Sequence, residues 1–270
     1  MCWSRWPART RERSIASEGY NLQRARREVR PFRLHFFPRL RSTNDHAAVL
    51  RRRGALFAPA AVVTSRQTAG RGRGSNTWFS TRGCMTATFV LPAEEHLPAA
   101  EVPLLAGLAV RDAAAWLCHD QEIRVKWPND LVYEGRKLAG LLCERVDGAD
   151  LIGVGLNVNL DVRRAPAGLR GRITSLSTIA GRRFDLTDVL AAVARSLHER
   201  MGLRRRRPAA ALLREYDRHH ALVGRQIMVH LPGHQPPLCG LCEGIDQQGR
   251  LLVRRGAELH RVISGHVEPA

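Results

Sequence analysis

The run Val125-Lys126-Trp127-Pro128-Asn129-Asp130-Leu131 and the run Arg136-Lys137-Leu138-Ala139-Gly140-Leu141-Leu142 are the most motif-like stretches of this sequence. They hold the only two lysines of the chain, because 41 of its 43 basic residues are arginines. Lysine is a compact charge on a thin stem, whereas arginine is a wide planar fork. A narrow pocket that holds one carboxylate or phosphate oxygen therefore selects lysine. An arginine-rich composition accounts for the 41 arginines, but it does not explain where the two lysines lie.

The same runs predict a local structure. Pro128 ends a short strand over residues 123–126, and Asn129-Asp130 favours a turn that directs a cation, an amide and a carboxylate toward one place. Strands over residues 131–133 and 138–143 then flank a hairpin-like turn. Lys137 opens an otherwise apolar strand, and a lysine buried there needs an anionic partner. An ordinary strand-end turn and a solvated lysine are the alternatives to a binding site.

A second site-like feature is the polar, glycine-rich loop that runs from Gln67 to Trp78 and contains Gly70-Arg71-Gly72-Arg73. Its glycines expose backbone amides to a ligand. Its arginines bring forked donors to phosphate or carboxylate oxygens, and Trp78 offers a flat face to a purine. The loop lacks the Walker ending and does not fit a dinucleotide fingerprint. Buried-type strands bracket it, so it is not an RNA-binding tail, and a mobile surface loop is the alternative.

A third feature is the strand expected over residues 151–158, which contains Gly153, Gly155 and Asn157. Two glycines and an asparagine are unusual inside a strand. The glycines make room for a ligand, and an asparagine amide can bind phosphate or the edge of a base. A bulged strand is the alternative.

The composition bounds the class of protein. Apolar residues make up 44% of the 270 residues and charged residues 25%, as in soluble globular proteins. No apolar run reaches the roughly 18–20 residues that span a bilayer, so no membrane association is expected. The net charge of +18 indicates an anionic partner such as nucleic acid, phosphate or an acidic protein. The arginines are scattered and no nucleic-acid-binding signature is present, so specific DNA binding is not expected.

Metal and covalent chemistry have little support in the sequence. Cys239 and Cys242 have CxxC spacing, but no second ligand pair lies at a suitable distance. We interpret the six cysteines as structural thiols in a reducing cytoplasm. No Ser/His/Asp or Cys/His arrangement stands out. The predicted site therefore works by charge stabilisation and positioning.

The chain divides into three predicted parts. Residues 1–31 are arginine-rich without apolar periodicity and are expected to form a disordered extension. Residues 32–222 alternate strands with helices, the latter expected over 99–118, near 186–200 and over 208–221. Residues 223–270 contain only short strands and turns, which predicts a small β-barrel.

Together these segments resemble a biotin–protein ligase, in family order and with family-like gaps, over about residues 33–268. The matching segments are Ser42-Thr43-Asn44, Gln67 with Ala69-Gly70-Arg71-Gly72-Arg73, Trp78, Lys126-Trp127-Pro128-Asn129-Asp130, Lys137-Leu138-Ala139-Gly140, and Gly153, Gly155 and Asn157. The run KWPNDL followed by RKLAG carries most of this resemblance.

The resemblance implies an α+β fold: a mixed sheet with helices, like that of class II aminoacyl-tRNA synthetases, followed by a small SH3-like β-barrel. It implies that ATP and biotin, with Mg²⁺, give biotinyl-5′-adenylate. The biotinyl group then passes to a lysine of a biotin carboxyl carrier protein domain of a biotin-dependent carboxylase. Some members carry an N-terminal DNA-binding domain, and we expect the monofunctional type without it. A homodimer remains open.

The resemblance also assigns residues to roles. Lys137, Arg71 and Arg73 are the expected catalytic residues. The biotin side comprises Ser42, Thr43, Asn44, Gln67, Arg71, Gly72, Arg73, Lys137 and Gly140. The ATP side comprises Arg73, Trp78, Lys126, Asn129, Asp130 and Asn157. Asp130 is also the candidate metal residue, acting through phosphate-bound Mg²⁺.

One departure from the family pattern concerns the phosphate side. Many members carry a further Gly and Arg after the GRGR core, where this chain has Gly74-Ser75-Asn76-Thr77. One arginine is thus missing, and whether another arginine replaces it is left open. A lipoate–protein ligase is the rival enzyme, disfavoured by KWPNDL and the GRGR loop. A basic nucleic-acid-binding protein is the non-enzyme rival, and it predicts steeply salt-dependent binding.

Overall fold

The computed structural model describes residues 16, 17, 19–95, 97–204, 206, 208–232 and 236–270. Its centre is a seven-stranded sheet in the order β3-β4-β5-β9-β8-β7-β6. The strands are β3 (Arg33–Leu40), β4 (Ala60–Gln67), β5 (Cys84–Pro92), β6 (Arg124–Lys126), β7 (Asp130–Tyr133), β8 (Arg136–Val146) and β9 (Ala149–Asn157). Only β3 and β4 pair in parallel, and the other neighbours are antiparallel. The mixed sheet predicted for this part of the chain is therefore present.

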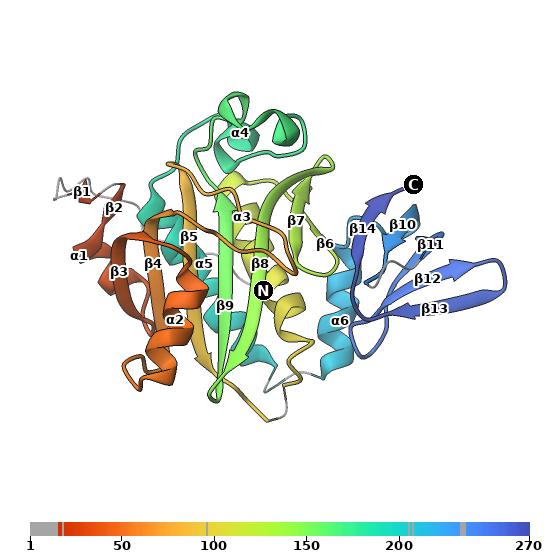
Figure 1. The fold of residues 1–270 in the computed structure, drawn as a ribbon, viewed down its shortest axis with the longest axis horizontal. Helices are drawn as coiled ribbons and strands as arrows, with labels where there is room; N and C mark the ends of the chain where they lie inside the picture. Colours follow the sequence, from red (N-terminus) through yellow and green to blue (C-terminus); the bar gives the residue numbers. More distant parts are fainter. Residues whose placement is uncertain (1–15, 18, 96, 205, 207, 233–235) are drawn as a thin grey trace.

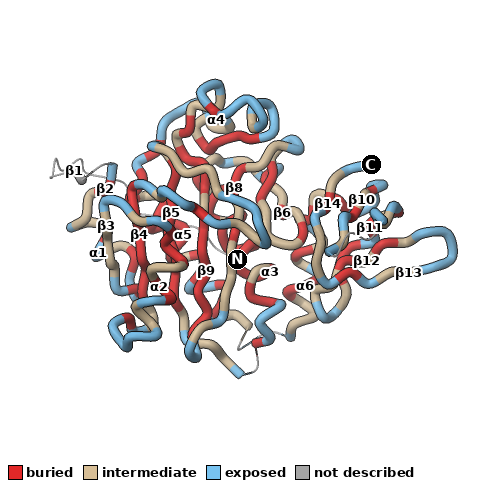
Figure 2. The backbone as a smooth tube through the Cα atoms, in the orientation of Figure 1, coloured by how far each residue is buried: buried red, intermediate tan, exposed pale blue. Residues whose placement is uncertain are grey.

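Helices cover both faces of the sheet. Two long helices, α3 (Val102–Cys118) and α5 (Leu186–Leu203), lie behind it, and α2 (Thr43–Arg52) lies in front (Figure 1). Strands covered on both sides can be apolar throughout, which explains the continuous runs Ala60–Val63 in β4 and Leu151–Ile152 in β9. The buried backbone accordingly follows the central strands, with exposed backbone at the turns (Figure 2).

The loop predicted between β4 and β5 crosses the front of the sheet. In Figure 1 this orange connection runs over β9 and β8. Gly72 N donates to Asn76 O at 2.8 Å, and Trp78 N donates to Gly70 O at 2.9 Å, so the loop folds back on itself. Asn76 donates from its backbone and its side chain to Arg73 O. It therefore stabilises the shape of the loop.

The expectation that residues 1–31 are a disordered extension is wrong for the described residues from 19 onward. Helix α1 (Leu22–Glu28) follows the short strands β1 (Ala16–Ser17) and β2 (Tyr20–Asn21). Tyr20, Ala25 and Val29 are fully buried in the main core. Arg24 forms an ion pair with Asp188 of α5 at 2.9 Å. The arginines of this segment obscured the apolar pattern of the helix, whose short apolar face needs packing on α5 to be stable. Residues 1–15 and 18 lie outside the described part.

A second sheet follows α6 (Ala209–Arg218). Its five antiparallel strands are in the order β13-β12-β11-β10-β14, and they match the predicted change to short strands. They are β10 (Gln226–His230), β11 (Leu238–Ile245), β12 (Leu251–Arg255), β13 (Glu258–Val262) and β14 (His266–Pro269), of which β14 was not predicted. Cys239 and Cys242 are free thiols on β11, the first exposed and the second buried.

Trp127 of the KWPNDL run joins the two sheets. Its indole is buried, and its Nε1 donates to Gly249 O in the β11–β12 turn at 3.0 Å. Its backbone N donates to His220 Nε2 at 3.1 Å. The tryptophan of this motif is therefore a structural residue.

None of the described helices has the length and apolar character needed to cross a bilayer.

The N-terminal segment gives a stability prediction. Tyr20 is fully buried, and its hydroxyl has no hydrogen-bond partner among the described residues. Tyr20→Ala should lower the free energy of unfolding by about 3–5 kcal/mol, as for other buried aromatic residues. Tyr20→Phe removes only the unpaired hydroxyl and should be neutral or stabilising. Denaturant titration of both variants checks this, and a Tyr20→Ala loss below about 0.5 kcal/mol, the scale of a surface substitution, would contradict the buried position.

Candidate active site

A cavity of about 870 Å³ opens on the front of the seven-stranded sheet. Its walls come from the N-terminus of α2, the β4–β5 loop, the strands β6 to β9, the segment that follows β9 and the C-terminal sheet. All the predicted site residues except Asn157 line it: Ser42, Thr43, Asn44, Gln67, Arg71, Gly72, Arg73, Trp78, Lys126, Asn129, Asp130, Lys137 and Gly140. Motifs separated by up to about a hundred residues therefore meet in one place.

A buried polar network forms the wall at α2. Ser42 caps the helix, and Gln67 Oε1 accepts from Thr43 N at 2.7 Å and from Thr43 Oγ1 at 3.1 Å. Thr88 Oγ1 of β5 donates to Asn44 Oδ1 at 2.6 Å. Because these polar groups already form hydrogen bonds with one another, the wall keeps its shape before a ligand binds. Thr88 was not predicted, since a threonine in an apolar strand has no motif around it.

Arg71 is held by two carboxylates. It forms ion pairs with Asp45 of α2 and with Glu144 Oε1 of β8, the latter at 3.0 Å. The hydrogen bond that Arg71 donates to Asp45 is the main cause that raises the pKa of Arg71. Asn44 Nδ2 donates to the other oxygen of Glu144 at 2.8 Å. The structure therefore pairs Arg71 with protein acids, whereas the sequence analysis expected it to meet only ligand oxygens. Glu144 had no signal in the sequence.

The two lysines lie on either side of one carboxylate. Lys137 Nζ is 2.7 Å from Asp130 Oδ1, and Lys126 is the cross-strand neighbour of Asp130. Burial lowers the pKa of Lys126, Asp130 raises it and Lys137 lowers it again. Burial also lowers the pKa of Arg73, and Asp130 opposes that effect. Three cations thus lie around Asp130, and Glu268 is a second counter-ion for Lys126; the cations outnumber these carboxylates, which leaves this part of the cavity positive and suited to a polyanion.

The metal expectation can be compared with the donors present. Among the described residues, no three His, Cys, Asp or Glu side chains come together as a metal site. Asp130 is a single carboxylate in this region and is already paired with Lys137. Mg²⁺ is commonly held by one or two carboxylates together with substrate phosphates. The donors therefore fit an ion that arrives on the phosphates of a nucleotide.

The glycines of β8 and β9 make room for other side chains of the site. A Cβ atom on Gly153 would overlap Asn44 Oδ1, and a Cβ atom on Gly155 would overlap the indole of Trp78. A Cβ atom on Gly140 would lie 3.2 Å from Lys137 Nζ. The prediction that these glycines create space is therefore correct in its physical reason, but the space is filled by the protein's own side chains.

The two asparagines predicted for the nucleotide side have different positions. Asn129 lines the cavity, while its amide donates to Leu141 O. Asn157 is buried and does not line the cavity. Its Nδ2 donates to Thr174 O at 3.0 Å and to Lys137 O at 3.5 Å. The expectation that Asn157 meets ATP is therefore wrong in this structure, because the amide is used to attach the chain after β9 to β8.

The C-terminal sheet supplies cavity residues that the sequence analysis missed. His230, His266 and Glu268 all line the cavity. His230 Nε2 is 2.7 Å from Glu268 Oε1. Burial lowers the pKa of His266, and the nearby Lys126 lowers it further. These residues are far from every motif in the sequence, and only the packing of the second sheet brings them to Lys126.

The sequence of residues 36–161 matches the Biotin/lipoate A/B protein ligase family. The biotin–[acetyl-CoA-carboxylase] ligase of Mycobacterium tuberculosis is 32% identical over 231 residues, which cover 84% of this chain and 85% of that protein. The bifunctional ligase/repressor BirA of Escherichia coli is 30% identical over 238 residues, which cover 85% of this chain and 72% of BirA.

Solved structures agree in fold. The biotin protein ligase from Aquifex aeolicus in complex with biotin and ATP superposes with a TM-score of 0.78 at 24% identity, covering 88% of this chain and 99% of that one. At that identity the likeness concerns the fold alone. The Leishmania major ligase in complex with biotinyl-5-AMP has a TM-score of 0.61 at 28% identity and covers 89% and 98% of the two chains.

A mixed sheet with a cationic cavity, joined to a small antiparallel sheet, defines a catalytic domain of the biotin/lipoate protein ligase class. Within that class, the chain belongs to the biotin–protein ligases.

The glycine positions give a prediction for the site. Gly153→Ala should cost about 1–3 kcal/mol of unfolding free energy, because the added methyl group forces Asn44 out of its network. Gly168→Ala is the matched control, since nothing lies within 4 Å of a Cβ atom there. Thermal or denaturant unfolding measures both. Equal stability of the two variants would show that Asn44 is not packed against β9.

Proposed function

We propose that this chain activates biotin with ATP to form biotinyl-5′-adenylate and then transfers the biotinyl group to a lysine of a biotin carboxyl carrier domain. The observation that carries the proposal is the shared cavity. It joins the polar wall at α2 to the cations around Asp130, and it belongs to a chain 32% identical to a biotin–[acetyl-CoA-carboxylase] ligase. The lipoate alternative is not favoured by these similarities.

The first half-reaction brings two anions together. A carboxylate oxygen of biotin attacks the α-phosphorus of ATP, and pyrophosphate leaves. Lys126, Lys137 and Arg73 offset the repulsion between the carboxylate and the phosphates, in a cavity where charges are partly desolvated. Mg²⁺ bound to the phosphates supplies further charge neutralisation.

The roles of individual residues follow from their positions. Lys137, opposite Asp130, is our candidate for contact with the reacting carboxylate and α-phosphate. Thr43, Asn44 and Gln67 provide the polar wall for the biotin ring system. We assign Trp78, which packs on Gly155, to the adenine. We infer that Arg71 closes the cavity, since Asp45 and Glu144 attach the loop to α2 and β8.

In the second half-reaction the ε-amine of the acceptor lysine attacks the acyl carbon of the adenylate. AMP leaves with the phosphate oxygen, and the amine loses a proton. The acceptor is the carrier domain of a biotin-dependent carboxylase.

We further infer that the chain has a catalytic unit, which includes α1 and extends to about residue 222, and a second unit over residues 223–270. We also infer a cytoplasmic location and no specific binding of DNA. A homodimer is the oligomer we would look for first.

The Lys137 assignment can be tested in the first half-reaction. Wild-type protein should catalyse biotin- and ATP-dependent pyrophosphate exchange. Lys137→Arg should lower the rate by on the order of 10²-fold, because a planar fork cannot take the position of the ammonium between Asp130 and Gly140.

Arg136→Lys is the matched control, because Arg136 is the neighbouring residue, forms an ion pair with Glu134 and does not line the cavity. It should keep wild-type exchange. Full exchange activity in Lys137→Arg would refute the role given to Lys137, and absence of exchange in the wild type would refute the proposed function.

A further inference from the structure

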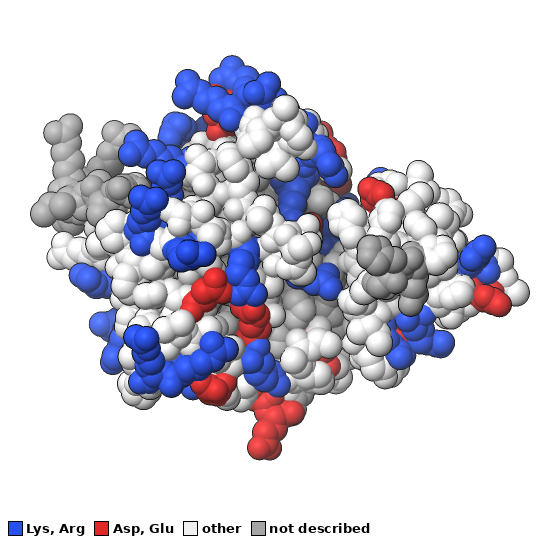
Figure 3. All heavy atoms as spheres, viewed as in Figure 1, with Lys and Arg blue, Asp and Glu red and all other residues white. Residues whose placement is uncertain are grey.

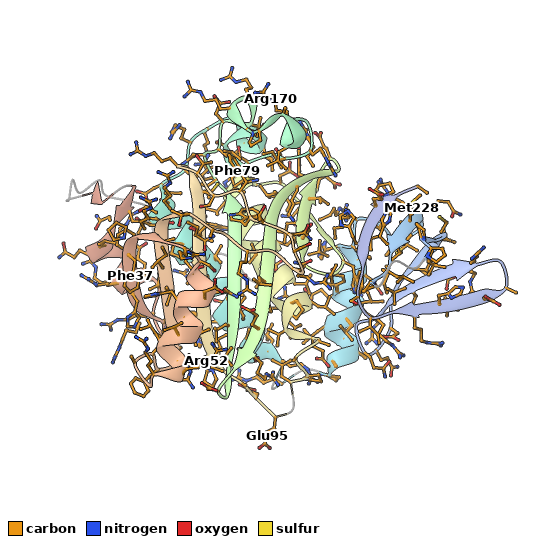
Figure 4. The ribbon with its side chains drawn as sticks, viewed as in Figure 1. Phe37, Arg52, Phe79, Glu95, Arg170 and Met228 are labelled. Atoms are coloured by element: carbon orange, nitrogen blue, oxygen red, sulfur yellow. The ribbon has the colours of Figure 1, made fainter. Side chains whose placement is uncertain are left out.

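The segment between β9 and α4 (Leu176–Ala180) forms a rim of the cavity that no motif predicted. It contains the short 3₁₀ helices η1 (Val162–Arg164) and η2 (Ala167–Leu169). Leu160, Ala165 and Ile173 form a small apolar cluster of their own, packed against Phe79. In Figure 4, Phe79 lies below Arg170 near the top of the molecule. The segment is therefore attached to the β4–β5 loop by burial.

Hydrogen bonds attach the end of the same segment to β8, beside Lys137. Lys137 N donates to Arg172 O at 2.8 Å, and Thr174 N donates to Lys137 O at 2.9 Å. Asn157 Nδ2 reinforces the pairing by donating to Thr174 O at 3.0 Å. The backbone of Arg172 is thus fixed next to the catalytic lysine, which keeps the side chain within reach of the reacting groups.

Arg172 lines the cavity. Its charge lies close enough to Lys126 to contribute to the lowered pKa of that lysine. The structure gives the Arg172 guanidinium no carboxylate partner among the described residues, in contrast to Arg71, which has two. Basic side chains are also visible on this face between the α4 region and the C-terminal sheet (Figure 3).

The charge balance of the cavity points to what Arg172 binds. Lys126, Lys137, Arg73 and Arg172 line the cavity together with the carboxylates of Asp130 and Glu268, of which Glu268 is 2.7 Å from His230, whereas Arg71 is neutralised by its own acids. The four cations outnumber these two counter-ions, and an anion of several charges relieves the repulsion among them. Beyond Arg71 and Arg73, the β4–β5 loop, which the structure describes in full, brings no cation to the cavity, and Asn76 of this loop is used to hold Arg73 O.

We propose that Arg172 binds the β- and γ-phosphates of ATP and stabilises the pyrophosphate as it leaves, in the role that the loop does not fill. The inference rests on the proposed function, since it concerns the same half-reaction. Arg172 is paired through its backbone with Lys137, and its charge acts on Lys126, whereas the polar wall that we assign to biotin lies at α2. Arg172 therefore acts on the leaving group and not on biotin, and its forked guanidinium matches phosphate oxygens.

The test compares Arg172→Ala, Arg172→Lys and the control Arg164→Ala. Arg164 is in the same segment, its side chain is 88% exposed, and it does not line the cavity. The probes are ATP and inorganic pyrophosphate in the biotin-dependent exchange, biotin itself, and preformed biotinyl-5′-adenylate in the transfer to a carrier domain. Thermal unfolding of each variant separates a structural effect from a binding effect.

Arg172→Ala should raise the KM for ATP and for pyrophosphate about ten- to hundredfold, the scale of a lost charged hydrogen bond. Its KM for biotin and its rate of transfer from preformed adenylate should stay within about twofold of wild type, and its midpoint of unfolding should not change. Arg172→Lys should recover part of the loss, because it keeps the charge without the fork.

Unchanged KM values for ATP and pyrophosphate in an active Arg172→Ala enzyme would overturn the inference and leave the proposed function intact. If Arg172→Ala lost as much of its rate in the transfer from preformed adenylate, the inference would also be overturned, since pyrophosphate has no part in that step. An equal rise in the KM for ATP and pyrophosphate in Arg164→Ala would show that the effect comes from general surface charge. Absence of exchange in the wild type would instead remove the proposed function on which the inference rests.

Discussion

Asp130 holds together cations that would otherwise repel one another across the cavity. Its carboxylate pairs with Lys137 and lies opposite Lys126 on the neighbouring strand, with Arg73 from the loop nearby. Without this counter-ion, the burial that lowers the pKa of Lys126 would favour loss of its proton. Asp130 and Glu268 both oppose the lowering of the Lys126 pKa, but the cations outnumber these carboxylates. The excess charge is what makes the cavity a site for carboxylate and phosphates.

The surrounding backbone preserves that arrangement. Leu141 N donates to Asn129 O while the Asn129 amide donates to Leu141 O, which fixes the turn before Asp130. Asn157 joins Lys137 to the segment that follows β9. Trp127 attaches the same motif to the C-terminal sheet. The KWPNDL run therefore combines charged residues that face the ligand with residues that hold two sheets together, and mutation of either kind should affect activity by a different route.

Short-range patterns made much of the fold predictable. Three predicted features depend on neighbours in the sequence: the buried strand before the glycine-rich loop, the Pro128 turn and the change to short strands after residue 222. Helix α1 was missed because few apolar residues face the core between its arginines: Leu22, Ala25 and, at the C-cap, Val29. Such a short helix is stabilised by packing on α5, and no local pattern reports that contact.

By itself, the sequence determined the class of fold, the residue types of the site and most of its members, because the motifs require particular side chains at fixed spacings. Only the tertiary structure decided how they are used. It paired Arg71 with Asp45 and Glu144, filled the space above Gly153 and Gly155 with protein side chains, and buried Asn157. It also brought Arg172 and the C-terminal sheet to the cavity. These outcomes depend on contacts between segments that are distant in the sequence. Each side chain acquires its partners only when the sheets and loops pack together.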